Sequence, residues 1–132
     1  MSPATTLPGR WRRGQTGGVE IRVKRVYEQP ASTDGFRVLV DRLWPRGLSK
    51  ERAEVDLWDK DVAPSSELRK AFHHEGMAWP DFEKAYRAEI GDGAALGALR
   101  EKLASHDTVT LLYATHDDEH NHALLLRAAL ER

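Results

Sequence analysis

Apolar and charged residues alternate along residues 19–27, and this period of two predicts a β-strand with one face toward solvent. Residues 36–41 are mostly apolar, which is typical of a central strand covered on both faces. The clearest strand signal lies in residues 108–114, a short run of β-branched, aromatic and aliphatic side chains. We therefore expect three strands, with a loop over residues 28–35 and a long helical segment between the second and the third.

Helix signals occupy most of that long segment. Ser65 is a suitable N-cap for a helix that ends at Gly76. Pro80 suits the first turn of a second helix, and Gly91 is placed to end it. Leucines spaced three and four residues apart predict a third helix over residues 94–105.

Three further elements complete the predicted order. Ser49 is placed to cap a single helical turn over residues 50–53, and residues 55–62 contain a short extended piece. A final helix is expected over residues 118–131. Two buried strands joined by a long helical connection imply a parallel pair with a right-handed crossover. The pattern predicts one α/β domain over residues 19–132, with a small, mainly parallel sheet flanked by helices.

Length and composition narrow the function classes. A chain of 132 residues fits one domain. The absence of cysteine excludes disulfides, zinc–cysteine sites and thiol nucleophiles. A net charge of −1 argues against a surface built generally for nucleic acid. No apolar run approaches the roughly 18 residues of a membrane span, so we expect no membrane partner.

Residues 1–18 differ from the rest of the chain. They contain three arginines, two prolines, four glycines and no acidic residue, which predicts a flexible basic tail. A basic arm that contacts phosphate is the alternative. The remaining residues hold 17 lysines and arginines against 21 acids, so the domain itself is acidic.

Polar residues gather in two loops that follow predicted strands, residues 41–47 and residues 115–122. In open parallel sheets, ligands bind beyond the carboxyl ends of the strands. We expect the two loops to meet there and to form the functional site.

The first loop suggests an anion pocket. Arg42 and Arg46 would bind the anion, and Asp41 would orient it or act as a general base. The alternative is a structural pair between Asp41 and an arginine, since a buried carboxylate needs a partner. Trp44 is interpreted as packing in the turn rather than as a stacking platform. If the segment after the extended piece folds back over this edge, Asp59 and Arg69 join the cluster.

The second loop offers an acid–base group or a metal site. His122 is a candidate general base, and Asn121 with nearby backbone N–H groups is a candidate anion binder. The alternative for His122 is a ring bonded to a backbone carbonyl. His116 and His120 lie four residues apart, as do Asp118 and His122, so the three histidines of this loop are candidate ligands for a divalent ion. A solvated helix start explains the same acids and histidines.

The string Asp-Arg-Leu-Trp-Pro-Arg-Gly at residues 41–47 resembles the YeaO-like branch of domain-of-unknown-function family 488. The resemblance covers about residues 20–130. It is carried by residues 23–27, 34–47, 58–60, 64–73, 111–114 and 121–123. The positions that match the branch are Asp41, Arg42, Trp44, Arg46, Trp58, Asp59, Arg69, Asn121 and His122.

What the resemblance implies is a cytoplasmic protein of bacteria or archaea with no settled activity. The resemblance also implies that other branches of the family carry a Cys-His-Arg string where this chain has Asn121-His122-Ala123. A mechanism that uses that thiolate or that arginine therefore does not transfer to this chain. Some members are labelled transcriptional regulators, but this sequence shows no helix–turn–helix with a basic recognition helix.

The leading hypothesis is an arginine-lined anion pocket of a hydrolase or transferase that acts on a small phosphorylated or nucleotide-like substrate. Asp41 and His122 would be catalytic. The substrate-binding residues would be Arg42, Trp44, Arg46, Trp58, Asp59, Arg69 and Asn121. The first alternative is a non-catalytic regulatory module that binds nucleic acid or protein, and the second is a protein that binds a divalent metal. No motif in the sequence identifies a cofactor.

Overall fold

A computed structural model describes residues 19–91 and 93–132. The strands are β1 (Glu20–Arg25), β2 (Phe36–Leu39), β3 (Leu57–Trp58) and β4 (Thr108–Tyr113). The helices are α1 (Lys50–Ala53), α2 (Ser66–His74), α3 (Trp79–Ile90), α4 (Ala94–Leu103) and α5 (His122–Glu131). Two short 3₁₀ turns, η1 (Ser32–Asp34) and η2 (Lys60–Val62), precede β2 and α2.

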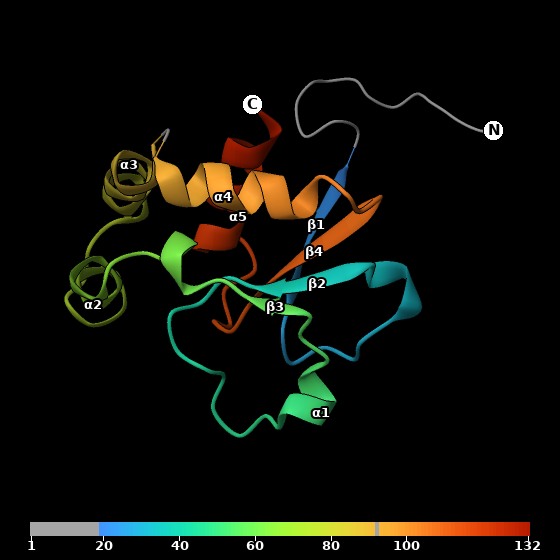
Figure 1. Cartoon of the computed structure of the whole chain (residues 1–132). Helices are drawn as coiled ribbons and strands as arrows, with labels where there is room; N and C mark the ends of the chain where they lie inside the picture. The colour runs from blue at the N-terminus through green and yellow to red at the C-terminus, as the bar shows by residue number, and fades with distance from the viewer. Residues whose placement is uncertain (1–18, 92) are drawn as a thin grey trace.

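The four strands form one parallel sheet in the order β1-β4-β2-β3 (Figure 1). Strand β4 is central, because Leu111 pairs with Val23 on one side and with Val38 on the other. The expected single α/β domain with a small parallel sheet is confirmed. The short extended piece expected within residues 55–62 is the edge strand β3.

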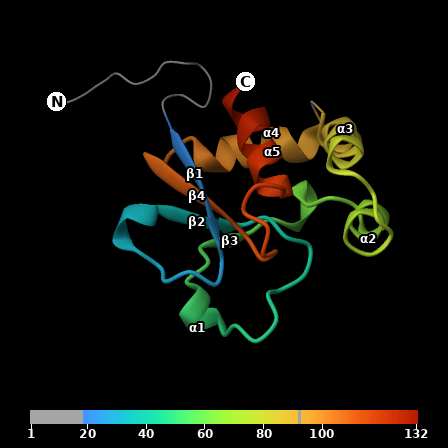
Figure 2. The ribbon, with the colours of Figure 1, turned by 180° about the vertical axis from the view of Figure 1, so that it is seen from behind.

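The two faces of the sheet are covered differently. Helices α2 to α5 lie on one side, and α1 lies on the other (Figures 1 and 2). Val38, Val40 and Leu111 face the larger core, which includes Leu99 of α4 and Leu126 of α5. The smaller cluster on the opposite face is formed by Val26, Leu39, Ala53 and Leu112. Alternation along β2 and β4 therefore divides their apolar residues between two unequal cores.

A buried ionic network completes the smaller face. The side chain of Arg37, 4% exposed, pairs with Asp34 and donates to the carbonyl oxygens of Ala53 and Glu54 at the end of α1. Lys24 Nζ lies 3.1 Å from the same carboxylate. Burial by itself raises the pKa of Asp34, but hydrogen bonds from a backbone N–H, Lys24 and Arg37 outweigh it and lower that pKa.

The chain crosses from β1 to β2 beneath β4 through a tight approach at Gly35. This residue has φ of +68°, and a Cβ there would lie 2.2 Å from the backbone oxygen of Thr108. Only glycine fits this position. The close contact explains how a connection of ten residues joins two parallel strands that both pair with β4.

The start of the final helix differs from the prediction. The final helix begins at His122 rather than at Asp118, because Asn121 caps it and accepts a hydrogen bond from the backbone of Leu124. The preceding loop is held by Asp117, whose carboxylate accepts from two backbone N–H groups. The N-caps expected at Ser49 and Ser65 are confirmed.

The predicted tail, residues 1–18, lies outside the described residues. Across residues 19–91 and 93–132, none of the helices has the length and apolar character that a membrane crossing requires.

The network predicts a large cost for Arg37→Met. The substitution removes a cation from a buried carboxylate and leaves two carbonyls unpaired, so urea denaturation at neutral pH should show a loss of about 3–5 kcal/mol. Arg22→Met is the matched control, because its ion pair with Glu20 is solvent-exposed, and it should change stability far less. Equal losses in the two variants would contradict the role of the network.

Candidate functional site

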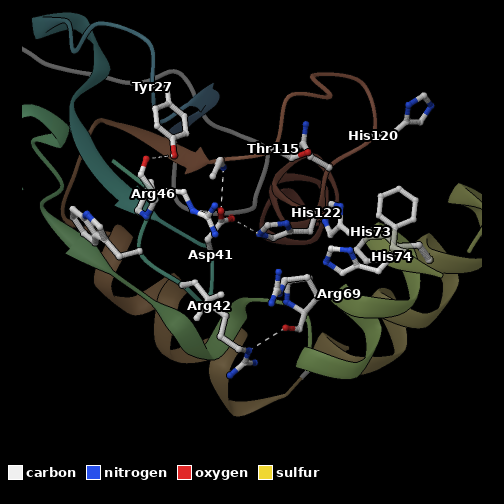
Figure 3. A pocket seen from close by; sticks show the side chains of 18 residues that line it. Tyr27, Asp41, Arg42, Arg46, Arg69, His73, His74, Thr115, His120 and His122 are labelled. Carbon is white, nitrogen blue, oxygen red and sulfur yellow. Dashed lines mark hydrogen bonds and ion pairs between the residues drawn. The ribbon is translucent and has the colours of Figure 1, made fainter. Parts of the chain in front are cut away.

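A pocket of about 440 Å³ opens at the carboxyl edge of the sheet, where the two polar loops meet the start of α5 and the helix α2 (Figure 3). The predicted site residues that line it are Asp41, Arg42, Trp44, Arg46, Arg69, Asn121 and His122. The structure therefore brings together predicted residues from three separate segments of the chain.

Asp41 lies at the base of this arrangement, just beyond the end of β2. Its Oδ2 accepts a hydrogen bond from the backbone N–H of Ala114, 3.0 Å away at the end of β4. Its Oδ1 lies 3.2 Å from His122 Nε2, and Trp58 Nε1 donates to its backbone oxygen at 2.8 Å. The hydrogen bond to this carboxylate thus comes from a backbone amide, while its buried Oδ1 has His122 as a close neighbour but no hydrogen-bond partner among the described residues. The pair with an arginine, which was the alternative, is not formed within the described residues.

The ring of His122 has a defined orientation. Its Nε2 lies 2.8 Å from the backbone oxygen of Val40. A carbonyl oxygen only accepts hydrogen bonds, so Nε2 carries the proton, and the lone pair of the neutral ring lies on Nδ1. The edge of the ring packs against Tyr86, with 5.8 Å between centroids. The bond to a carbonyl that the sequence left open as the alternative is present, and the ring lines the pocket as well.

The three arginines of the pocket differ in their engagement. Arg42 donates to the carbonyl oxygens of Pro64 and Ala63, so its guanidinium fixes the segment that leads into α2. Arg46 is exposed at the rim. Arg69 is half-buried on α2, and its Nε has no hydrogen-bond partner among the described residues. Arg46 and Arg69 are therefore the guanidinium groups best placed to meet a ligand.

Helix α2 adds two histidines that the sequence analysis left outside the site. His73 and His74 line the pocket beside Arg69. Burial lowers the pKa of His73, and the nearby Arg69, His122 and His74 lower it further, while Asp41 opposes them. The signal that could have found this pair is the spacing of Arg69 and His73, which lie one helical turn apart and so share a face.

Two residues that were expected to bind substrate do not line the pocket. Trp58 packs edge-on against Trp44 in the smaller core, where it holds the backbone of Asp41. Asp59 is buried, and it caps η2 by accepting from the backbone of Asp61. Burial raises the pKa of Asp59, and that hydrogen bond opposes the shift. Both side chains shape the edge of the sheet from behind the pocket.

Asn121 is committed to structure. It is 2% exposed, its Oδ1 accepts from Leu124 N–H, and its Nδ2 donates to the backbone oxygen of Asp117. Because both ends of the amide take part in these bonds, this side chain positions α5 and His122.

The two loop histidines proposed as metal ligands, His116 and His120, have different surroundings. His120 Nδ1 lies 3.0 Å from Asp117 Oδ2, and His116 is exposed in the same loop. Their four-residue spacing carries no helical meaning, because α5 begins only at His122. In residues 19–91 and 93–132, the structure contains no group of three His, Cys, Asp or Glu side chains that could hold a metal ion.

The contact between Asp41 and Ala114 predicts a local effect. Asp41→Ala leaves the amide of Ala114 without its acceptor, which should cost about 1–3 kcal/mol of stability and speed hydrogen exchange at that amide. Asp41→Asn keeps a side-chain oxygen there and should preserve its protection. NMR hydrogen exchange at Ala114 measures both effects, and equal exchange in the two variants would contradict the proposed role of the carboxylate.

Comparisons with known proteins assign the chain to a family. A family model described as "Inactive DUF488-N3 subclade" matches residues 20–132. The uncharacterised protein YeaO of Escherichia coli (strain K12) is 44% identical over 108 residues, which are 82% of this chain and 94% of that protein. The uncharacterised proteins Mb3100c of Mycobacterium bovis and Rv3073c of Mycobacterium tuberculosis are each 46% identical over 110 residues, 83% of this chain and 92% of each relative.

No solved structure matches the chain. The match to the family model spans nearly all the described residues, and YeaO is similar over most of both chains. The chain therefore belongs to the inactive DUF488-N3 subclade, in the YeaO-like branch of family 488.

Proposed function

We propose that the protein binds a small ligand with a phosphate or carboxylate group in this pocket, without chemically converting it. The charge of the lining carries the proposal. In the described part of the chain, three arginines and four histidines line the pocket, and Asp41 is the one carboxylate among the lining residues. This cationic surface lies in a domain whose acids outnumber its lysines and arginines, so it is a local feature that favours anions.

The engagement of the side chains assigns roles within this proposal. Arg69 and Arg46 would bind the anion through charge-assisted hydrogen bonds, and His73 and His74 would add charge when protonated. Arg42 would keep the start of α2 in place through its bonds to Pro64 and Ala63. Arg69, His73 and His74 are held on α2 before any ligand arrives, which lowers the entropic cost of binding.

Three observations favour binding over turnover. The chain has no cysteine, so no thiol nucleophile is present. Oδ2 of Asp41 accepts from the amide of Ala114, and Nε2 of His122 is bonded to the backbone oxygen of Val40. The description of the matching family model also includes the word "inactive".

A hydrolase or transferase is the second candidate, and the Asp41–His122 pair favours it. A carboxylate 3.2 Å from an imidazole that lines a pocket is the arrangement of an acid–base pair. Incubation with 4-nitrophenyl phosphate separates the two candidates. Binding without release of 4-nitrophenol supports the first, and release that His122→Ala abolishes supports the second.

Binding of inorganic phosphate should depend on Arg69. Isothermal titration calorimetry of Arg69→Gln should show an affinity about 10- to 100-fold lower than that of the wild type, since hydrogen bonds to charged groups contribute about 1.5–3 kcal/mol. Arg87→Gln is the matched control, because this arginine pairs with Glu83 on the surface of α3 and does not line the pocket. A binding free energy of about 4 kcal/mol corresponds to a Kd of about 1 mM, so phosphate at about 10 mM would nearly saturate such a site. A wild-type protein that shows no binding at this concentration would contradict the proposal.

Anion binding should strengthen as the pH falls. The lowered pKa of His73 keeps its ring neutral at neutral pH, and protonation below about pH 6.5 adds a positive charge to the pocket. Calorimetry with sulfate, whose charge stays constant over this range, should therefore give tighter binding at about pH 5.5 than at about pH 7.5.

The control for this prediction is a pair of substitutions. His73→Gln should flatten the pH dependence, whereas His116→Gln should retain it, because His116 is exposed and does not line the pocket. Equal pH profiles for the wild type and His73→Gln would show that this ring does not titrate with the ligand.

A further inference from the structure

The pocket has two unlike sides. Figure 3 shows Arg69, His73 and His74 of α2 on one side of Asp41, and Tyr27 beside Arg46 on the other. The side chains of Leu43, Trp44 and Pro45 also contribute to the lining, and they follow one another along the same loop. Helix α2 thus supplies Arg69 and two histidines on one side, and the other side supplies Tyr27 together with the cation Arg46.

On the side of the pocket that holds Arg46, the aromatic ring exposed to an entering ligand is that of Tyr27. Tyr27 is 39% exposed and lines the pocket. Tyr27 and Leu43 are both exposed large hydrophobic residues, and both line this pocket. Exposed apolar surface grouped at a cavity indicates a contact surface, whereas a single exposed apolar residue does not. The sequence analysis placed Tyr27 at the end of a strand and assigned it no role.

The ring of Tyr27 is held in place at two points. Its hydroxyl donates to the backbone oxygen of Arg46 at 2.7 Å. The guanidinium carbon of Arg25 lies 4.6 Å from the ring centroid, within the range of a cation–π contact. Arg25 is itself fixed, because its Nε donates to the backbone oxygens of Ala114 and Thr115. The aromatic surface is therefore preorganised.

Trp44 does not offer an equivalent surface. Its Nε1 donates to the backbone oxygen of Leu48 at 2.6 Å, and its ring packs against Trp58 in the smaller core. The indole is thus mainly a packing group, as the sequence analysis interpreted it. Tyr27 remains the ring of this side whose exposure and fixation suit stacking.

We propose that Tyr27 is a stacking platform and that the ligand is a phosphate ester bearing a planar aromatic ring. This inference rests on the proposed function, since the phosphate would occupy the side formed by Arg69 and His73. The ring would then lie against Tyr27 in an offset stack. The pocket of about 440 Å³ lies within the range of 300–1,000 Å³ that is typical of small-ligand sites. Simple aryl phosphates and mononucleotides share this chemistry.

Two matched pairs of probes test the proposal by calorimetry. Phenyl phosphate and cyclohexyl phosphate have rings of similar size, but only the first is flat and aromatic. AMP and ribose 5-phosphate differ by the base. The wild-type protein should bind the aromatic member of at least one pair about 5- to 100-fold more tightly, as expected for one stacked ring. A larger ratio in the AMP pair identifies the ring as a nucleobase, and a larger ratio in the phenyl pair identifies it as a simple aryl group.

Substitutions at Tyr27 assign the preference to this residue. Tyr27→Leu should bring the ratio of the two dissociation constants close to one, whereas Tyr27→Phe, which keeps the ring, should retain a preference of several-fold. Leu43→Ala is the control, because Leu43 is 59% exposed on the same side and is not aromatic. Leu43→Ala should change the dissociation constants of both members of a pair by the same factor. Circular dichroism confirms that each variant is folded.

The outcomes separate this inference from the function on which it rests. If inorganic phosphate binds but the members of each pair bind equally, the platform is wrong and the anion site stands. If the preference exists but Tyr27→Leu retains it, another residue stacks and the assignment to Tyr27 is wrong. If no phosphate compound binds, both proposals fail.

Discussion

The carboxylate of Asp41 joins the elements on which the pocket depends. Its Oδ2 accepts the amide of Ala114, which follows β4, and its Oδ1 lies beside His122 at the start of α5. Its backbone oxygen accepts the indole N–H of Trp58 from β3, while Val40, the preceding residue, bonds to both β4 and His122. One residue at the end of β2 therefore connects the ends of two other strands and a helix, which gives the pocket a rigid base.

The same residue determines the electrostatics of the pocket. A single negative charge at the base compensates part of the positive charge of the surrounding rings and guanidiniums, so these groups can lie together without a bound anion. Burial lowers the pKa of His73, and Arg69, His122 and His74 lower it further against the opposing effect of Asp41, so the carboxylate compensates the neighbouring cations only in part. An anion that enters would relieve this repulsion, because it supplies the charge that Asp41 alone does not.

The sequence predicted the fold more fully than the contacts of the site. Period-two and apolar runs identified β1, β2 and β4, and the rule for carboxyl ends brought Asp41 and His122 together correctly. It could not predict that Asp41 would bond to the backbone of Ala114, because a backbone partner leaves no mark in residue types. It also missed His73 and Tyr27, since their approach depends on how α2 and the end of β1 pack in three dimensions.

Asn121 links the binding proposal to the chemistry of the wider family. A cysteine at this position, which the resemblance implies for other branches, would stand at the N-cap of α5, where the helix dipole lowers the pKa of a thiol. Asparagine places an acceptor there for Leu124 and a donor for Asp117. The position that would activate a nucleophile is therefore used to begin the helix, and His122 keeps its place beside the pocket. Such an exchange removes a reactive atom but leaves the arginines and histidines of the pocket in place, which is what the proposed binding without conversion requires.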